Sequence, residues 1–263
     1  MVWLTSQSLG LLVAGSLAIA LLIAVASRLA LRALLPESER EGAHTVAAPL
    51  MSPLGAAFAI LAALTLANEA SFLTSSQQIV SNEAADASRL AWAATMPGVR
   101  TAPIQASLAS YLQAVRGHEW HGVSAAEGND APTLRTLAHL ERGVRTQAAR
   151  SVVGTPTSSE LLTAMDSLTI DRRDRLAAAA REPPGFYVIT LAFSGFALIA
   201  GAAALTLRAR RRVALLIGGL TIVVGLSLAL ILALGNPWRG TTFVGGHPVD
   251  VVIRDLGTGY FRR

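Results

Sequence analysis

Four long stretches without acidic or basic side chains constrain this chain more than any other feature. They run over residues 1–27, 42–68, 183–207 and 213–238, and His44 is the one histidine among them. A helix crosses a bilayer with about 20 apolar residues, at a rise of about 1.5 Å for each residue. All four stretches are long enough, and buried helices of a soluble core rarely go so far without charge. The sequence therefore predicts four transmembrane helices.

Composition supports a membrane protein and excludes several other classes. Hydrophobic residues make up 52% of the 263 residues and charged residues 15%, with a mean hydropathy of +0.48. Ordinary soluble domains carry about 25% charge. The absence of cysteine excludes a disulfide framework, thiolate metal sites and a cysteine nucleophile. A net charge of +5 over the whole chain is too diffuse to indicate a nucleic-acid partner.

The first stretch is predicted to be an uncleaved membrane span. A secretory signal has a basic start and an apolar core of about 7–15 residues before its cleavage site. Here no charged residue precedes Arg28, and the apolar run is longer than such a core.

Residues 69–182 form a polar region with 11 arginines and 12 acidic residues. We expect the second span to continue into it as one helix from Ser52 to about Thr95, because residues 56–96 contain neither proline nor glycine, and Pro97-Gly98 to end it. Further helices are predicted over 103–122 and 133–152, with a loop over 123–132. A last helix opens with a capping box at residues 157–160 and ends near Pro183.

Apolar residues at helical spacing predict the face that each of these helices buries. The expected core residues are Ile104, Leu108, Tyr111, Leu112 and Val115, then Leu134, Leu137 and Val144, then Leu161, Met165 and Leu168. In the C-terminal segment, Pro248 fits the first turn of a short helix. Its apolar face would consist of Val249, Val252, Ile253 and Leu256.

The predicted fold is an all-α polytopic membrane protein with four transmembrane helices and a helical domain inserted between helices two and three. Residues 1–68 hold transmembrane helices 1 and 2, residues 69–182 the extramembrane domain, residues 183–235 transmembrane helices 3 and 4, and residues 236–263 a C-terminal segment that contains Pro-Trp-Arg-Gly. Small residues at helical spacing would let the spans approach closely: Ser16, Ala20, Ala24, Ala197, Gly201, Gly218 and Gly225.

Arginines in the two short connections predict the orientation. Cytoplasmic loops are enriched in basic residues, and these connections carry Arg28, Arg32, Arg40, Arg208, Arg210, Arg211 and Arg212. The central domain and both termini would then be extracytoplasmic, in the plasma (inner) membrane of a bacterium. Four arginines on the other side of span three, between positions 172 and 181, count against this orientation.

Three carboxylates stand out by position. Glu119 continues the apolar stripe of Tyr111 and Val115, so we expect it to be partly buried and paired with an arginine or a backbone donor. The alternative is an ion-pathway or proton-linked carboxylate. Glu69 and Glu83 lie fourteen residues apart, within about 40° on one helix face. A ring of Glu69 carboxylates with Asn68 could tune a pore mouth, and the alternative is a helix-end residue that faces water.

Other polar residues give weaker indications. His118 and His121 are one helical turn apart, but no third ligand has a diagnostic spacing, so no metal site or cofactor is predicted. Trp238 and Arg239 fit an interfacial belt, with a gating role as the alternative. The chain has no lysine-containing phosphate loop, no His-Glu-x-x-His and no Gly-x-Ser-x-Gly. No catalytic residue is assigned, and we expect the protein not to be an enzyme.

Several short motifs, in their order along the chain, match one family. They are His44 before span two, Glu69 and Glu83, Tyr111, Val115 and Glu119-Trp120, then Pro237-Trp238-x-Gly240, Val244, Pro248 and Leu256. On these residues the chain, from about Glu41 to Leu256, resembles the bestrophin-like domain-of-unknown-function family of bacterial and plant membrane proteins. Tryptophan stands where the family pattern has Pro-Phe-x-Gly.

The resemblance implies kinship with bestrophins, which are pentameric anion channels with four membrane helices in each subunit. Their large helical domain also falls between spans two and three. In bestrophins that domain is cytoplasmic, whereas the arginines here place it outside. Span two also lacks an aromatic neck, since it offers Phe58 alone.

Three functions follow from these patterns. The first is a homo-oligomeric ion channel or pore lined by span two and its extension. Anions are one candidate for the permeant ion, and an acidic mouth at Glu69 argues for cations instead. The second is a non-conducting scaffold or sensor whose extracytoplasmic helices bind an envelope or membrane protein partner. The third is a metal-dependent membrane enzyme that uses His118 and His121. The lipid bilayer is the expected environment in every case.

Overall fold

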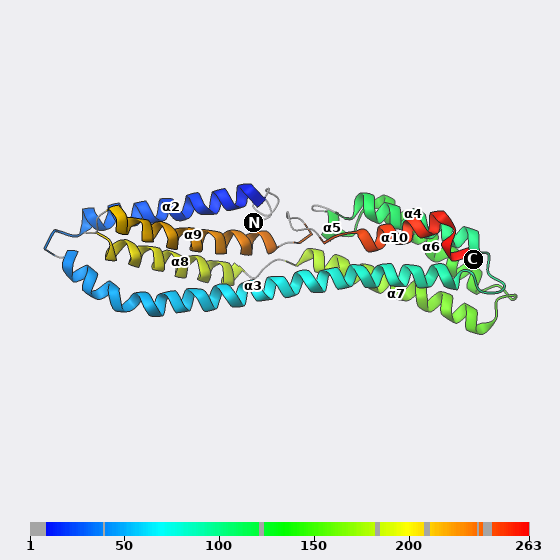
Figure 1. Ribbon diagram of the computed structural model, residues 1–263. Coiled ribbons are helices and arrows are strands. Elements are labelled where there is room, and N and C mark those ends of the chain that lie inside the picture. Colours follow the sequence, from blue (N-terminus) through cyan, green and yellow to red (C-terminus); the bar gives the residue numbers. More distant parts are fainter. Residues whose placement is uncertain are drawn as a thin grey trace. The chain divides into compact units, whose positions relative to one another are not determined.

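The protein is helical throughout the part of the chain that the structure describes, with no strand. This computed structural model describes residues 9–38, 40–120, 124–181, 185–207, 211–235, 237–238 and 244–262. Figure 1 shows the elements. The helices are α2 Leu9–Leu34, α3 Arg40–Ala93, α4 Thr101–His118, α5 Ser124–Glu127, α6 Ala131–Ala148, α7 Thr155–Ala180, α8 Gly185–Leu205, α9 Arg211–Leu234 and α10 His247–Thr258, with a 3₁₀ turn η1 at Tyr260–Arg262. The all-α prediction is confirmed.

The chain folds as two compact units. Unit 1 consists of Met1–Ser71 and Glu182–Asn236, and unit 2 of Phe72–Arg181 and Pro237–Arg263. Helix α3 contributes its first part to unit 1 and its second part to unit 2.

Among the residues that the structure describes, four helices are long and apolar enough to cross a membrane. They lie within Gly10–Leu34, Thr45–Ala93, Thr155–Leu205 and Ile217–Leu234. In the third range the apolar part is α8, because α7 carries charged side chains along its length. This agrees with the four spans expected from the sequence, and it indicates a multi-pass membrane protein.

In unit 1, helices α2, α8 and α9 pack together and α8 also contacts the first part of α3 (Figure 1). The buried side chains between them are apolar: Ala20, Ala24, Phe58, Leu191, Leu198, Ile199, Ala202, Ile217, Val224 and Ile231. Many large apolar side chains on these helices are exposed, among them Leu22, Leu64 and Phe193. Apolar surface that faces outward is stable in lipid rather than in water.

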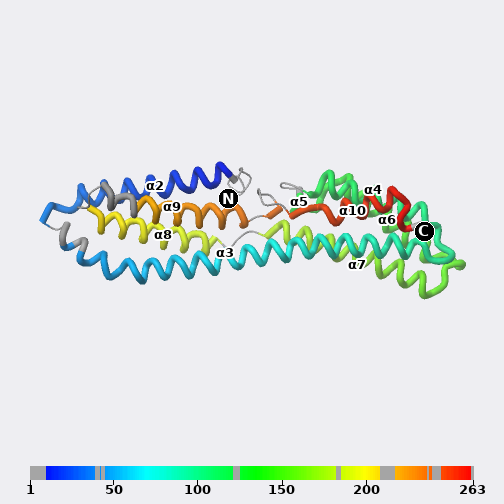
Figure 2. The backbone as a smooth tube through the Cα atoms, in the orientation of Figure 1, coloured from blue at the N-terminus to red at the C-terminus, as the bar shows by residue number. Residues whose placement is uncertain are grey.

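Helix α3 begins earlier than the sequence indicates. It starts at Arg40 rather than Ser52 and contains Pro49 and Pro53. The tube in Figure 2 bends over these first turns. Each proline removes one helical N–H donor and bends the helix there. Membrane helices tolerate such breaks. The helix therefore extends through both prolines, and the start predicted at Ser52 is too late.

Glycines set the close contacts between the helices of unit 1. A Cβ on Gly225 of α9 would lie 2.9 Å from Leu17 Cδ2 and 3.3 Å from Leu17 Cα of α2. A Cβ on Gly195 of α8 would lie 2.9 Å from Val224 Cγ1. Small residues therefore fix these crossings. Gly225 is among the small residues expected from the sequence to do so, and Gly195 is not. Gly218, which the sequence groups with Gly225, has nothing within 4 Å of its Cβ position.

We expect Gly225→Val to destabilise unit 1 by about 1–3 kcal/mol, because the added carbons overlap the backbone of α2 and separate the helices. Gly218→Val is the matched control on the same helix, and its Cβ position is open. A change within about 0.5 kcal/mol is expected there. Thermal unfolding of the purified protein in detergent measures both. Equal losses in the two variants would contradict a contact fixed by Gly225.

In unit 2, helices α4, α6, α7 and α10 and the second part of α3 share one apolar core (Figure 2). The stripes expected for α4, α7 and α10 are buried, with Ile253 of α10 partly so. On α6 one expected core residue is wrong, because Leu134 is 41% exposed and Leu140 is fully buried. Leu140 lies on the same face as Leu137 and Val144, at spacings of three and four residues. Leu134 lies in the first turn of α6, at the edge of this face.

Several helix ends differ from the sequence prediction. The loop expected over 123–132 contains the short helix α5, and α4 ends at His118 rather than 122. Helix α6 begins at Ala131, where the Asp130 carboxylate accepts hydrogen bonds from the Thr133 hydroxyl and amide, which lower the pKa of Asp130. The prediction that a capping box at residues 157–160 begins the last helix of this region is wrong. Helix α7 starts two residues earlier, at Thr155, because Pro156 fits its first turn.

Candidate functional site

Four charged side chains meet in the interior of unit 2. Glu83 comes from α3, Glu119 follows the end of α4, and Arg172 and Arg175 lie one turn apart on α7. All four are buried, and Glu83, Glu119 and Arg175 have no exposed side-chain surface. We call these four residues the charge cluster.

Arg175 bridges the two carboxylates. Its Nε donates to Glu83 Oε2 at 2.7 Å, and its Nη2 donates to Glu119 Oε2 at 3.3 Å. Its Nη1 donates to the Glu119 backbone carbonyl at 3.2 Å. Burial by itself would lower the pKa of Arg175, but the negative charge of Glu83 outweighs it and raises that pKa above its usual value. The guanidinium therefore stays charged.

Arg172 is the second positive charge of the cluster, and it pairs with Glu119. Its Nη2 donates to Glu119 Oε1 at 2.5 Å and to the Gly128 carbonyl at 3.3 Å. Gly128 has φ +62, and a Cβ there would lie 2.7 Å from Leu176 Cδ1, so glycine suits this position. Two arginines face two carboxylates, and the cluster is neutral. The ion pair expected for Glu119 is thus present.

Tyr111 of α4 adds a neutral donor to the cluster. Its hydroxyl donates to Glu83 Oε1 at 3.4 Å. Burial raises the pKa of Tyr111 well above its ordinary value, and the negative charge of Glu83 raises it further. The phenol therefore keeps its proton and remains a hydrogen-bond donor.

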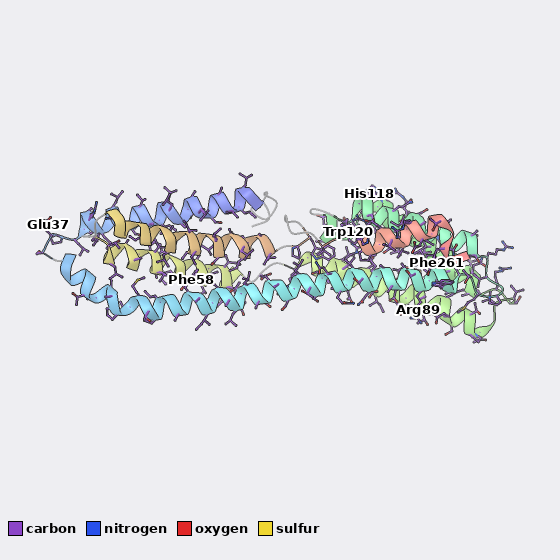
Figure 3. The ribbon with its side chains drawn as sticks, viewed as in Figure 1. Glu37, Phe58, Arg89, His118, Trp120 and Phe261 are labelled. Atoms are coloured by element: carbon purple, nitrogen blue, oxygen red, sulfur yellow. The ribbon has the colours of Figure 1, made fainter. Side chains whose placement is uncertain are left out.

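Trp120, which is labelled in Figure 3, connects the charge cluster to the C-terminal segment. The Arg175 guanidinium lies 5.5 Å and that of Arg116 4.7 Å from its ring centroid. Its Nε1 donates to the Val244 carbonyl at 3.3 Å, and its ring meets Trp238 edge-on at 6.1 Å. Arg116 in turn forms a two-pronged ion pair with Asp250 of α10, at 2.6 and 3.0 Å. Indole and guanidinium together hold the C-terminal segment against α4.

The structure brings together four of the seven residues singled out from the sequence: Glu83, Glu119, Trp120 and Trp238. It places the others elsewhere. Asn68 is exposed on α3 in unit 1, Glu69 is 3% exposed there, and Arg239 lies outside the described residues. Trp238 is 2% exposed, so its interpretation as a lipid-facing belt residue is wrong. Its ring packs on Trp120 inside the protein.

Sequence reasoning missed the arginines of the cluster. Arg172 and Arg175 continue the stripe of Leu168 on α7 at spacings of four and seven residues, so a charge on an apolar face was the available signal. The same argument identified Glu119 on α4. Asp250 and Arg116 carried no such signal, because both lie on partly exposed helix faces.

The structure places one histidine of the pair. His118 is half exposed, with Nδ1 3.9 Å from Asp130 Oδ1, and His121 lies outside the described residues. Within the described ranges, no three histidine or carboxylate side chains are arranged so that they could hold a metal ion.

Two acidic side chains, Asp171 and Asp86, contact each other beside the charge cluster. The carboxyl of Asp171 on α7 lies beside that of Asp86 on α3, close enough to share a hydrogen bond when one of the two is protonated. Partial burial, this hydrogen bond and the negative charges of Asp86, Glu83 and Asp174 raise the pKa of Asp171 to about 6. Two carboxyl groups can share a hydrogen bond only when one of them is protonated.

This contact predicts a pH-dependent stability. The folded state holds the Asp171 proton more tightly than the unfolded state, so stability is highest below the unfolded pKa near 4 and falls as the pH rises towards 6. Asp171→Asn removes the effect. At pH 7 we expect the variant to be more stable by about 1 kcal/mol, a value reduced for solvent screening at a partly exposed group.

Thermal unfolding at pH 4 and pH 7 tests this expectation. The gain from Asp171→Asn should be large at pH 7 and small at pH 4. Asp166→Asn is the control, because it removes an exposed negative charge from the same helix. Identical behaviour of the two variants would show that the contact with Asp86 has no effect.

Comparison with known proteins adds the family. No curated protein and no solved structure matches the chain. The family model of the bestrophin-like domain matches residues 18–248, which include most of the first candidate membrane helix, the other three, the charge cluster and Trp238. The chain therefore belongs to the bestrophin-like domain family.

Proposed function

We propose that the protein is the subunit of a homo-oligomeric ion channel or pore of bestrophin type, with α3 lining the conduit. Membership of the bestrophin-like family supports a membrane protein of this type. The observation that carries the proposal is the exposed face of α3. Between positions 74 and 82, in unit 2, the exposed residues are all polar and all uncharged: Thr74, Ser75, Gln77, Gln78, Ser81 and Asn82.

The charged residues of α3 in unit 2 are engaged elsewhere. Glu83 pairs with Arg175, Asp86 contacts Asp171, and Arg89 forms a two-pronged ion pair with Glu160 at 2.6 and 3.0 Å. The remaining hydroxyl and amide side chains form a wettable stripe without fixed charge. Such groups can line a water-filled path, and they select ions by charge only weakly.

The apolar part of α3 favours an assembly of several copies. Only 11% of the most apolar 18-residue stretch of α3 is buried inside the chain, compared with 39% of the corresponding stretch of α9. The rest of this surface needs lipid or another subunit. A conduit built from four-span subunits needs a closed ring, in which each copy contributes the same helix.

Ion flux in liposomes that contain the purified protein tests the proposal. Flux of potassium and of halide above that of empty liposomes is expected, with little preference between them. Gln78→Glu adds one negative charge to the stripe in each subunit and should shift selectivity towards potassium. Gln113→Glu makes the same change on an exposed position of α4 and should leave selectivity unchanged. Glu69→Gln tests the acidic mouth, and we expect no effect because Glu69 is buried.

Absence of flux at varied pH, calcium and voltage would overturn the channel. It would favour the second function, a non-conducting scaffold or sensor whose helical domain binds an envelope or membrane protein partner. The neutral charge cluster favours that alternative, because it holds α3, α4 and α7 together without an open polar path among them. Co-purification with the intact protein would then identify the partner.

The proposed location is the plasma membrane of a bacterium, with unit 2 and both termini extracytoplasmic. The arginines of the two short connections support this orientation. Because the chain lacks cysteine, a single introduced cysteine reports its own side. An impermeant thiol reagent applied to intact cells should label Ser151→Cys and not Ser38→Cys, and the reverse result would invert the topology.

A further inference from the structure

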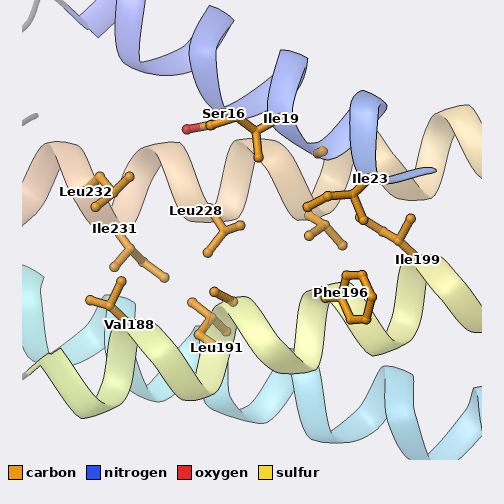
Figure 4. A pocket seen from close by; sticks show the side chains of 13 residues that line it. Ser16, Ile19, Ile23, Val188, Leu191, Phe196, Ile199, Leu228, Ile231 and Leu232 are labelled. Atoms are coloured by element: carbon orange, nitrogen blue, oxygen red, sulfur yellow. The ribbon is translucent and has the colours of Figure 1, made fainter. Parts of the chain in front are cut away.

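Unit 1 contains an apolar cavity of about 190 Å³ among α2, α8 and α9 (Figure 4). Ile19 and Ile23 of α2, Leu191 and Phe196 of α8, and Leu228 and Ile231 of α9 line it. Of the thirteen lining residues only Ser16 has a polar side chain. A cavity with so few polar partners does not hold ordered water.

Small residues account for the space. Gly225 brings α9 against Leu17 of α2, and Gly195 brings α8 against Val224 of α9, so the helices meet at these points. Between the contacts, Ala20 and Ala192 are too short to fill the gap that the larger side chains leave. An unfilled void of this size would cost stability.

The shape and the opening of the cavity indicate what fills it. Its wall on α8 runs from Val188 to Ile199, about three helical turns. Ile19 is 60% and Phe196 47% exposed, so the cavity reaches the outer surface of unit 1. Because these helices are membrane spans, the medium at that surface is lipid hydrocarbon. A cavity of about 150 Å³ holds benzene, so this one has room for several methylene groups.

We propose that the cavity binds one acyl chain of a membrane phospholipid, held between α2, α8 and α9. The headgroup stays at the membrane interface, since the lining offers no charged partner for it. The chain fills the void and completes the packing of the three helices. This site depends on insertion in the membrane and not on ion conduction, so failure of the channel proposal would leave it intact.

The test is photocrosslinking of the full-length protein in phosphatidylcholine vesicles that contain a fraction of phosphatidylcholine with a diazirine on its acyl chain. Mass spectrometry of the digested protein locates the adducts. We expect them to be enriched on cavity residues such as Leu191 and Leu228, relative to the outward-facing Ile189 and Phe193.

Filling the cavity should remove this enrichment. Ala20→Leu and Ala192→Leu should each reduce the cavity adducts several-fold, without lowering the thermal stability of the protein. Ala18→Leu is the matched control, because Ala18 is exposed on α2 and does not line the cavity. Reduction in the two cavity variants and not in the control would support the site.

Three results would overturn the proposal. Adducts spread evenly over cavity and outward residues would show ordinary lipid contact. Displacement of the labelled phospholipid by excess free fatty acid would assign the site to free fatty acids. Crosslinks between protein chains at the cavity residues would show that a second copy, rather than a lipid, covers this surface.

Discussion

Arg175→Met should destabilise the protein by about 3–5 kcal/mol, because it leaves Glu83 buried without its ionic partner. Methionine keeps much of the side-chain volume, so the loss reports charge rather than a cavity. Arg175 also donates to the Glu119 backbone carbonyl, which would lose that hydrogen bond. Thermal and denaturant unfolding in detergent measure the effect.

Two further variants separate the ion pair from general damage to α7. Arg173→Met changes an exposed arginine two residues away and should alter stability by less than about 0.5 kcal/mol. Arg175→Met combined with Glu83→Gln removes both charges of the pair and should recover much of the loss, because an unpaired buried charge costs more than a missing pair. If the double variant is no more stable than Arg175→Met, the buried charge of Glu83 is not the cause.

Trp120→Ala should also cost about 3–5 kcal/mol, since it removes a large side chain with 1% exposure from the core. The same change frees the Val244 carbonyl and the ring of Trp238. We therefore expect the amides of α10 to exchange hydrogen much faster, while those of α8 and α9 change little. Hydrogen exchange followed by mass spectrometry resolves these segments.

Trp92 provides the control for Trp120. It is 44% exposed and its ring meets Tyr260 and Phe261 edge-on, at 5.9 and 5.5 Å. Trp92→Ala should cost less and loosen η1 alone. Trp120→Phe should fall between the two, because it keeps a ring but loses the indole N–H, a hydrogen bond worth about 1 kcal/mol. Equal release of α10 in all three variants would show that Trp120 has no special part in holding the C-terminal segment.

Local patterns were sufficient to predict most elements of the fold. The apolar stripes of α4 and α7 were correct because helical spacing alone decides which side of a helix can be buried. Errors came where a nearby residue changed a local rule. Pro49 and Pro53 lie inside α3, and Pro156 moves the start of α7 away from the expected capping box. Leu134 is exposed because it lies at the start of α6, where its neighbours do not cover it.

The candidate site could be predicted only in part. Glu119 was identified from its place on an apolar stripe, together with its need for a partner. Which arginine forms the ion pair with Glu119 depends on how α7 packs against α3 and α4. The sequence does not give that packing. Arg175 lies 92 residues from Glu83, and Arg172 lies 53 residues from Glu119.

The sequence by itself determined the all-helical fold, four helices long and apolar enough to cross a membrane, and the family. These properties depend on hydrophobicity, length and short motifs, which are local along the chain. Only the tertiary structure decided that Glu83 and Glu119 share Arg175, that Trp120 reaches Val244 at a separation of 124 residues, and that α2, α8 and α9 leave a cavity. Contacts between distant segments arise when helices pack, because packing selects one arrangement among many that satisfy the same local patterns.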